Sequence, residues 1–182
     1  MQTRLGRSGT KPKGTTSAFR LEAHRRPTGE LRGEIVAIAQ KLSPKWFTPN
    51  VPADTYRDLG FQDAFVLKQE GKVLSFIVYT CIDGSIHITL MGTRPDLMGM
   101  GLGSTLLEGF FNHVKGLGFD RIITYTVPPD KKPVYSNTLR FYERHGFTLA
   151  RRFDELWEAG ALQMIKNLDE TAYASRRTSD AS

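Results

Sequence analysis

Apolar residues recur at helical spacing between residues 30 and 42, where Leu31, Ile35, Ile38 and Leu42 fall on one side of a helix. A proline at position 44 ends this helix, because the residue before a proline disfavours helical backbone. Three more segments are expected to be helical, and a glycine at position 146 closes the last of them. These helices are expected at residues 54–59, 102–116 and 134–145.

Other segments alternate apolar and polar residues or are apolar throughout, as strands are. Residues 18–26 alternate Phe19, Leu21 and Ala23 with polar side chains, which predicts a short edge strand. Residues 73–82 are mostly apolar, so this strand is expected to be central and covered on both faces, and Asp83-Gly84 turns it into the next. The strands are expected at residues 18–26, 64–68, 73–82, 85–91, 121–127, 147–153 and 161–168. This order of elements predicts an α/β fold, in which a mixed central sheet has helices on both faces.

Composition limits the class of protein further. At 182 residues, of which 40% are apolar, the chain is long enough for one domain with a single core. The one cysteine, Cys81, excludes a disulfide framework and a thiolate metal cluster, and its place in an apolar strand predicts a core residue rather than a nucleophile. No apolar run reaches the roughly 18 residues of a membrane span, and no apolar segment follows the basic N-terminus as in a secretory signal. We expect a cytoplasmic protein.

The formal charge of +6 is unevenly distributed. Residues 1–28 hold seven basic side chains and one acidic side chain, so they carry the whole net charge. Residues 1–17 have almost nothing to bury and are expected to be a disordered leader, while residues 18–168 form the domain and residues 169–182 a flexible tail. The leader suits nucleic acid or another acidic partner. No aromatic residues interleave with its charges, however, so a solvated segment is favoured.

Three glycines, Gly99, Gly101 and Gly103, follow the strand 85–91 and lead into the helix 102–116. Glycines let the backbone approach a ligand closely, and the first amides of a helix lack internal partners at the positive end of the helix dipole. This combination predicts a site for phosphate or diphosphate, although an ordinary turn uses glycines too. No Lys-Ser or Lys-Thr follows, which excludes a nucleotide triphosphate loop. The spacing also differs from the dinucleotide-binding motif, and no acidic residue ends a second strand as that fold requires.

The segment 98–103, Met-Gly-Met-Gly-Leu-Gly after Arg94-Pro95, resembles the acyl-CoA loop of the GNAT (Gcn5-related) N-acetyltransferase superfamily. The family pattern is Gln/Arg-x-x-Gly-x-Gly/Ala, and this sequence departs from it at the first position, which is Met98. Residues 141–147, Phe-Tyr-Glu-Arg-His-Gly-Phe, are similar to the family's second signature, a helix that ends in Phe/Leu-Tyr-x-x-x-Gly-Phe. Two blocks in this order are more specific than either alone. The resemblance covers about residues 19–168 and implies a GNAT-type mixed, mostly antiparallel central sheet flanked by helices on both faces.

The resemblance implies an enzyme that transfers an acetyl group from acetyl-CoA to a primary amine of a small molecule or protein, by direct attack in a ternary complex. In the family, the strand before the glycine loop bulges and splays from its neighbour, so that the pantetheine arm pairs with its edge, and Gly92 fits such a bulge. An amide of this strand would stabilise the oxyanion. Cofactor contacts are implied for Leu90, Met91, Gly92, Thr93, Met98, Gly99, Met100, Gly101, Leu102, Gly103, Ser104, Asn137 and Tyr142.

Two catalytic residues follow from the same resemblance. Tyr142 would protonate the departing thiolate, and the alternative is an aromatic residue packed in the core. His87, on the strand before the loop, would accept the ammonium proton, since an ordinary imidazole titrates near about pH 6.5. Alternatives to His87 are a solvent-facing histidine without a role, with Glu70, Glu158 or a chain of water molecules in its place.

The resemblance also bears on contacts further from the reacting atoms. The family often has an asparagine seven residues before the tyrosine, where Tyr135 stands here, while Asn137 lies five residues before it. Either residue would contact the cofactor arm. Trp46 and Phe47, in the loop after the first helix, and Trp157 are implied as walls of the acceptor site, although hydrophobic plugs under a loop are equally consistent with this pattern.

His24 and His113 lack acidic or cysteine partners at ligand spacing, so no metal is expected. No acidic cluster marks the acceptor site, which argues against polycationic antibiotics as acceptors. Two other functions stay open, namely a non-catalytic acyl-CoA sensor or binding module and a nucleic-acid-associated protein that acts through the basic leader. We expect no membrane partner, and a homodimer is compatible with the sequence.

Overall fold

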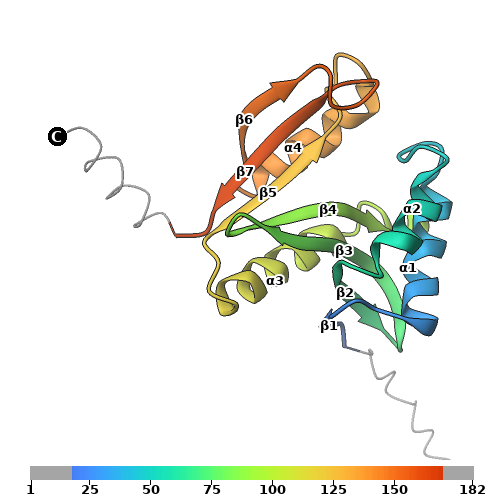
Figure 1. The fold of residues 1–182 in the computed structure, drawn as a ribbon. Helices are drawn as coiled ribbons and strands as arrows, with labels where there is room; N and C mark the ends of the chain where they lie inside the picture. The colour runs from blue at the N-terminus through green and yellow to red at the C-terminus, as the bar shows by residue number, and fades with distance from the viewer. Residues whose placement is uncertain (1–17, 170–182) are drawn as a thin grey trace, which may run out of the picture.

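The computed structural model of the chain describes residues 18–169, which form one seven-stranded sheet in the order β1-β2-β3-β4-β5-β7-β6 (Figure 1). Every neighbouring pair is antiparallel except β4 and β5, which run parallel. The strands are β1 (Arg20–His24), β2 (Asp63–Gln69), β3 (Lys72–Ile82), β4 (Ser85–Thr93), β5 (Arg121–Thr126), β6 (Thr148–Phe153) and β7 (Ala161–Asn167). The predicted mixed, mostly antiparallel sheet is therefore confirmed.

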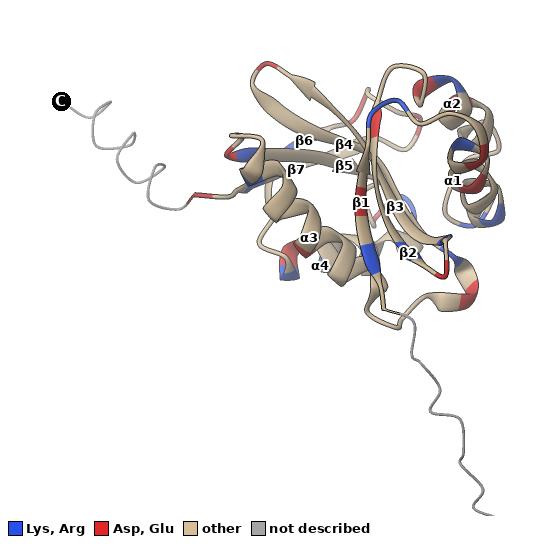
Figure 2. Ribbon diagram, turned by 90° about the horizontal axis from the view of Figure 1, so that it is seen from below, with Lys and Arg blue, Asp and Glu red and all other residues tan. Residues whose placement is uncertain are grey.

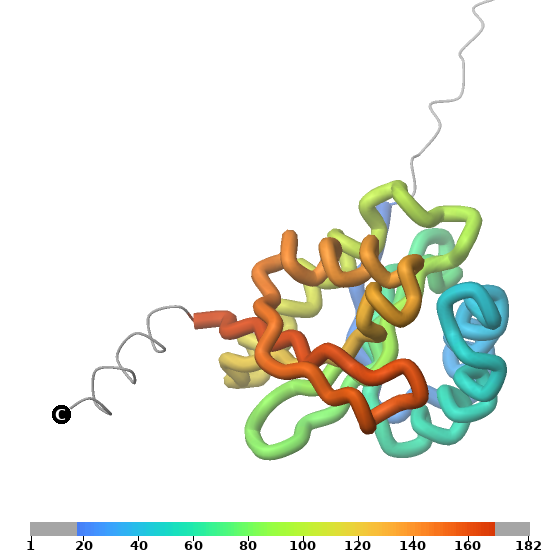
Figure 3. Tube along the Cα trace, turned by 90° about the horizontal axis from the view of Figure 1, so that it is seen from above, coloured from blue at the N-terminus to red at the C-terminus, as the bar shows by residue number. Residues whose placement is uncertain are grey.

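Two helices cover each face of the sheet. The helices α1 (Gly29–Leu42) and α2 (Val51–Asp58) lie on one face, and α3 (Leu102–Gly116) and α4 (Ser136–Arg144) on the other. Figure 3 shows α1 and α2, in blue to cyan, separated from α3 and α4, in yellow and orange, by the strands. Short 3₁₀ turns, η1 (Pro95–Leu97) and η2 (Pro133–Tyr135), precede α3 and α4.

Each face of the sheet has its own hydrophobic core. Leu106 and Phe110 of α3 pack with Ile77 of β3 in the core on the α3/α4 face. Ile35 of α1 packs with Phe76 of β3 in the core on the α1/α2 face. Phe76 and Ile77 are successive residues, and successive side chains of a strand point to opposite faces. The strand β3 is thus covered on both faces, as its apolar sequence predicts.

The strand β4 carries a bulge at Thr89. Val78 and Tyr79 are neighbours on β3, whereas their partners on β4 are Leu90 and Ile88, so Thr89 is an extra residue between them. A bulge of this kind bends a strand and increases its local twist. The predicted bulge in this strand is therefore present, although not at the predicted residue.

Gly92, where the bulge is predicted, pairs in register with Phe76 instead. A Cβ atom at position 92 would lie 2.8 Å from Leu42 Cδ1 and 2.9 Å from Phe76 Cε1. Glycine is needed here because α1 packs closely against the sheet, and not because the backbone requires unusual dihedral angles. The sequence shows the glycine and predicts the helix, but it does not show that the helix packs over the glycine.

Beyond the bulge, β4 also separates from β5. Ile88 opposite Thr124 is the last parallel pair between the two strands. Within the described residues 18–169, residues 90–93 pair with β3 alone, so the other edge of this segment has no strand beside it. The predicted splay of β4 from its neighbour is confirmed, and it leaves backbone amides and carbonyls available on that edge.

Two further expectations need correction. Cys81 is exposed rather than buried, because β2 begins at Asp63, opposite Tyr79, and the end of β3 beyond that pair has a neighbouring strand on one side only. The short helix predicted at residues 54–59 begins earlier, at Val51, since Pro52 occupies the first turn. A proline is tolerated there because its missing amide would have no partner within the helix.

The surface of the domain is mixed in charge. Figure 2 shows Lys, Arg, Asp and Glu residues intermixed along α1 and α2. In residues 18–169, no helix is long and apolar enough to cross a membrane. The predicted basic leader, with Arg4, Arg7, Lys11 and Lys13, lies outside the described residues, and so does the predicted tail, residues 169–182, except for Asp169.

Candidate functional site

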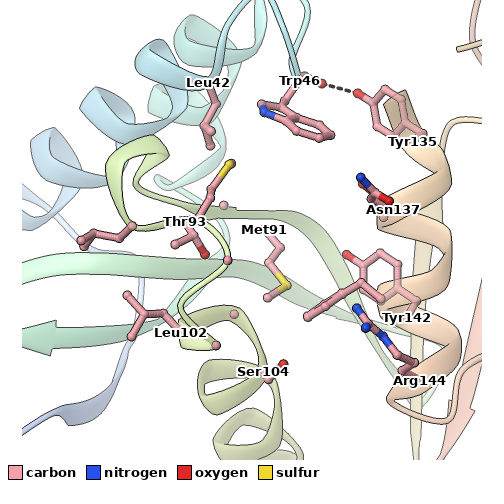
Figure 4. Close-up of a pocket in the computed structure, with 18 of the residues that line it drawn as sticks. Leu42, Trp46, Met91, Thr93, Leu102, Ser104, Tyr135, Asn137, Tyr142 and Arg144 are labelled. Atoms are coloured by element: carbon pink, nitrogen blue, oxygen red, sulfur yellow. Dashed lines mark hydrogen bonds between the residues drawn. The ribbon is translucent and has the colours of Figure 1, made fainter. Parts of the chain in front are cut away.

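A cavity of about 530 Å³ opens between the diverging end of β4 and α4 (Figure 4). Its walls are the end of β4, the glycine loop with the start of α3, the loop after α1, and α4 with the turn before it. The lining residues are Leu42, Trp46, Phe47, Met91, Gly92, Thr93, Leu97, Met98, Gly99, Gly101, Leu102, Gly103, Ser104, Tyr135, Asn137, Thr138, Phe141, Tyr142 and Arg144.

The glycine loop and the start of α3 form the first wall. Gly99 and Gly101 have φ angles of 82° and 80°, a left-handed conformation that other residues rarely adopt. Gly101 is the N-cap of α3 and offers no side-chain oxygen to the helix. The amides of Leu102, Gly103 and Ser104 therefore have no partner inside the helix, and they stand at the positive end of its dipole. This wall can bind an anionic oxygen.

The free edge of β4 forms the second wall. Met91, Gly92 and Thr93 line the cavity, whereas Leu90 packs against the core on the α1/α2 face. The Ser75 hydroxyl donates to the Gly92 carbonyl at 3.0 Å and lies 2.8 Å from Thr93 Oγ1. These bonds hold the end of β4 to β3 and leave its opposite edge facing the cavity.

Tyr142 lies on the α4 wall and is only 6% exposed. Its side chain shares a hydrogen bond with Thr124, and the Thr124 hydroxyl donates to the Ile88 carbonyl at 3.3 Å. Burial raises the pKa of Tyr142, and the bond with Thr124 offsets only part of this effect. The phenol therefore stays protonated at neutral pH and holds a proton that it can donate.

A hydrogen bond connects the loop after α1 to the α4 wall. The Tyr135 hydroxyl donates to the backbone carbonyl of Trp46, which Figure 4 marks with a dashed line. The two rings lie edge to face with their centroids 6.4 Å apart. Burial raises the pKa of Tyr135, so this donor keeps its proton at neutral pH. The bond joins two segments that are far apart in the sequence across the cavity.

The structure places most of the predicted cofactor residues around this one cavity. Two of them do not line it, since Leu90 lies on the other face of the sheet and Met100 is 67% exposed. Of the predicted acceptor residues, Trp46 and Phe47 line the cavity. Trp157 does not, because it lies in the loop between β6 and β7.

His87 lies outside this cavity as well. It stands between Ile86 and Ile88, which both belong to the core on the α3/α4 face. The alternation of side chains places His87 on the α1/α2 face, opposite to Tyr142. Burial lowers the pKa of His87, against a smaller raising effect of the Asp83 charge, so its imidazole is neutral near pH 7.

A second cavity, of about 120 Å³, lies on the α1/α2 face beside the bulge. Thr89 and Leu90 of β4 line it together with Asp54 and Asp58 of α2. Burial and, after it, the charge of Asp54 raise the pKa of Asp58. The large cavity has no Asp or Glu among its lining residues, whereas the small cavity has these two. The spacing of four residues between the two carboxylates is visible in the sequence, but the position of the bulge that they flank is not.

Thr138, Phe141 and Arg144 line the large cavity although the sequence analysis does not single them out. They recur every three residues on α4, so they share one side of the helix with Tyr142. This spacing is the signal that identifies them once Tyr142 is chosen. In residues 18–169, no group of three or more His, Cys, Asp and Glu side chains is placed to hold a metal ion.

The comparisons with known proteins concern the family and the fold of the chain. Residues 61–149 match the sequence model of a family described as the acetyltransferase (GNAT) domain. The matched segment runs from β2 to the start of β6 and includes the glycine loop, α3 and α4. Among curated proteins, none matches the sequence.

Several solved structures share the fold. A GNAT-family protein from Desulfovibrio desulfuricans has a TM-score of 0.72 at 16% identity, and the alignment covers 84% of this chain and 100% of that chain. The ribosomal-protein-S18-alanine N-acetyltransferase from Escherichia coli has a TM-score of 0.69 at 16% identity, with 84% and 95% covered. A GNAT-family acetyltransferase from Elizabethkingia anophelis with acetyl-CoA bound has a TM-score of 0.63 at 12% identity, with 82% and 97% covered. At these identities the likeness concerns the fold.

Proposed function

We propose that this chain is a member of the GNAT acetyltransferase superfamily and transfers the acetyl group of acetyl-CoA to a primary amine of a small molecule or protein. The observation that carries the proposal is the meeting of two backbone surfaces in one cavity, the start of α3 and the free edge of β4. The first surface suits a diphosphate, and the second suits an arm with amide groups that can pair like an added strand. Acyl-CoA contains these two parts in succession.

Each part of the cofactor has its proposed contacts. The backbone of the glycine loop and the amides at the start of α3, residues 98–104, bind the diphosphate. The backbone of residues 90–93 pairs with the pantetheine arm, and Asn137 approaches the arm from α4. Met98 offers neither a charge nor a hydrogen-bond donor in its side chain, so the main chain supplies the contact at this position.

Acetyl-CoA supplies an activated thioester when it is bound. In the proposed reaction the amine nitrogen forms a bond to the carbonyl carbon, the bond from that carbon to sulfur breaks, and Tyr142 gives its proton to the sulfur. A backbone amide from residues 90–93 donates to the carbonyl oxygen while it carries negative charge, and a donor of this kind contributes about 3–4 kcal/mol. Tyr142 suits its role because burial keeps the phenol protonated at neutral pH.

The acceptor amine must lose a proton, and we propose that the base lies on the α1/α2 face. His87 is the first candidate because its imidazole is neutral near pH 7. Asp58 is the second, because it lines the small cavity beside the bulge and burial raises its pKa. Neither residue lines the large cavity, so a water molecule would carry the proton from the amine to the base.

The proposed walls of the acceptor site are Trp46 and Phe47, which line the large cavity beside the end of β4. Trp157 is 45% exposed in the β6–β7 loop, where it is accessible to a large acceptor. A peptide or a bulky amine would use all three side chains, and a small amine only the first two.

Release of free thiol from acetyl-CoA tests the proposal. The full chain is incubated with acetyl-CoA and a panel of amino acids, small amines, polyamines and peptides with free N-termini, in the presence of a thiol-reactive chromophore. Thiol release that depends on one class of amine, with the acetylated amine identified by mass spectrometry, supports the assignment. Thermal stabilisation by acetyl-CoA without turnover on any amine would contradict it and would favour a non-catalytic acyl-CoA sensor.

The basic leader offers a different function, binding to nucleic acid. It rests on Arg4, Arg7, Lys11 and Lys13, outside the described residues. Binding of this kind weakens steeply with salt and would disappear when residues 1–17 are removed. Binding that is absent or insensitive to salt would discard this alternative.

A further inference from the structure

The lining of the large cavity includes one side chain with a permanent charge. Among its lining residues, only Arg144, the last residue of α4, is a Lys, Arg, Asp or Glu. The glycine loop and the start of α3, residues 98–104, contribute no charged side chain. Just before that loop, Arg94 and Asp96 neutralise one another in an ion pair of 2.7 Å. The balance of charge in the cavity is therefore positive, and Arg144 is its source.

Arg144 has no carboxylate partner among residues 18–169. Other arginines in this part of the chain do, since Arg57 pairs with an aspartate at 2.9 Å and Arg152 pairs with two, at 2.9 and 2.8 Å. Figure 4 shows the Arg144 guanidinium on the α4 wall beside Tyr142, with Ser104 and the start of α3 on the neighbouring wall. A guanidinium that is satisfied by no internal anion is available to an anionic group of a ligand.

We propose that Arg144 binds a phosphate group of coenzyme A and thereby sets the preference of the site for the phosphorylated cofactor. This inference rests on the proposed function. The planar guanidinium forms two parallel hydrogen bonds to phosphate oxygens, which gives both affinity and orientation. Coenzyme A presents two groups with this chemistry, its diphosphate and the phosphomonoester on its ribose.

The position of Arg144 has a second physical consequence that needs no ligand. A cation in the last turn of a helix interacts favourably with the negative end of the helix dipole. Arg144 is such a residue. The two roles differ in what they affect, since the dipole role changes stability alone and the phosphate role changes affinity for the cofactor.

Calorimetric titration of the full chain separates the two roles. The ligands are acetyl-CoA and acetyl-dephospho-CoA, and the variants are Arg144→Gln, Arg144→Lys and the control Arg151→Gln. Arg151 is an exposed residue of β6, with its guanidinium 4.6 Å from the Phe153 ring centroid, and it does not line the cavity. Its replacement changes the net charge by the same amount, so it controls for long-range attraction between the chain and the ligand.

We expect Arg144→Gln to weaken acetyl-CoA binding about tenfold at low salt, the loss expected for a charged hydrogen bond on an exposed side chain. Arg144→Lys should retain part of the affinity, and Arg151→Gln should bind as the unaltered chain does. If the ribose phosphate is the partner, the unaltered chain prefers acetyl-CoA over acetyl-dephospho-CoA and Arg144→Gln loses that preference. If the diphosphate is the partner, Arg144→Gln weakens both ligands equally. Either result supports the proposal.

Unchanged affinity of Arg144→Gln for both ligands would overturn the proposal and leave only the interaction with the helix dipole. Thermal unfolding of each variant shows that the protein used in the titration is folded. If the unaltered chain binds neither ligand, the proposed function itself fails, which is a different outcome from unchanged binding by the variant.

Discussion

Tyr142 on α4 and Thr124 on β5 share a hydrogen bond at the point where β4 and β5 begin to diverge. Thr124 is the partner of Ile88 in the last parallel pair, and its hydroxyl donates to the Ile88 carbonyl at 3.3 Å. The phenol is thus fixed at the closed end of the opening, where burial keeps it protonated. Under the proposed function, this is the place where a departing thiolate needs a proton.

Replacing Tyr142 by Phe removes this proton and keeps the ring. We expect turnover to fall about a hundredfold, as for loss of a general acid, with a much smaller change in acetyl-CoA affinity. Steady-state rates and calorimetric titration measure the two effects. Tyr56→Phe is the matched control, because Tyr56 is 56% exposed on α2 and does not line the cavity. Unchanged turnover in Tyr142→Phe would reduce the residue to a packing role.

The pH dependence of the rate distinguishes the two candidate bases. A base must be deprotonated, so the rate rises with pH through its pKa. Burial lowers the pKa of His87 from the usual 6.5, so with His87 as base the midpoint of the rise lies below pH 6.5 and the rise is lost in His87→Gln. Burial raises the pKa of Asp58 above the usual 3.8, and with Asp58 as base the rise persists in His87→Gln and is lost in Asp58→Asn. A rate that is independent of both substitutions would reject both residues.

Gly92→Ala tests the close packing between α1 and the end of β4. The new methyl group would lie 2.8 Å from Leu42 Cδ1 and 2.9 Å from Phe76 Cε1, so we expect a loss of about 1–3 kcal/mol in the free energy of unfolding. Chemical denaturation measures the change. Gly33→Ala in α1 is the control, since no atom lies within 4 Å of the added Cβ, and we expect it to stabilise the chain by up to about 1 kcal/mol. Equal stability of the two variants would contradict this explanation of Gly92.

Tyr135→Phe tests the connection between the α1–α2 loop and α4. It removes the hydrogen bond to the Trp46 carbonyl, which contributes about 1 kcal/mol. We expect the acceptor wall to loosen, so that the KM for the amine rises more than the KM for acetyl-CoA. Tyr125→Phe is the control, because it removes a hydrogen bond of 2.7 Å from Gln163 at a residue outside the cavity lining. Equal effects on both KM values in Tyr135→Phe would argue against a role in acceptor binding.

Two walls of the candidate site, the glycine loop and α4, are visible in the sequence because each is a local pattern. The glycine spacing at Gly99 and Gly101 corresponds to two left-handed residues at the start of α3, and Tyr142 lies within a short helical signature. Such features depend on the backbone conformation of a few consecutive residues. Sequence analysis therefore identifies them without knowledge of the tertiary structure.

Features that depend on register or on packing between distant segments are missed. The bulge falls at Thr89 because of how β4 pairs with β3, and the glycine that suggested it, Gly92, is needed for contact with α1. Cys81 is exposed although its strand is apolar, because β2 begins opposite Tyr79 and does not extend alongside Cys81. Arg144 is missed because its place in the cavity lining depends on how α4 packs beside the glycine loop. Each of these positions is set by a partner elsewhere in the chain.

Calorimetric titration with acetyl-CoA tests most directly whether the glycine loop and the free edge of β4 form an acyl-CoA site. Saturable binding of acetyl-CoA is the predicted result. It should be weakened in Gly101→Val, because a β-branched residue does not readily adopt the φ of 80° found there. An absence of heat at millimolar acetyl-CoA with the folded, unaltered chain would contradict the assignment.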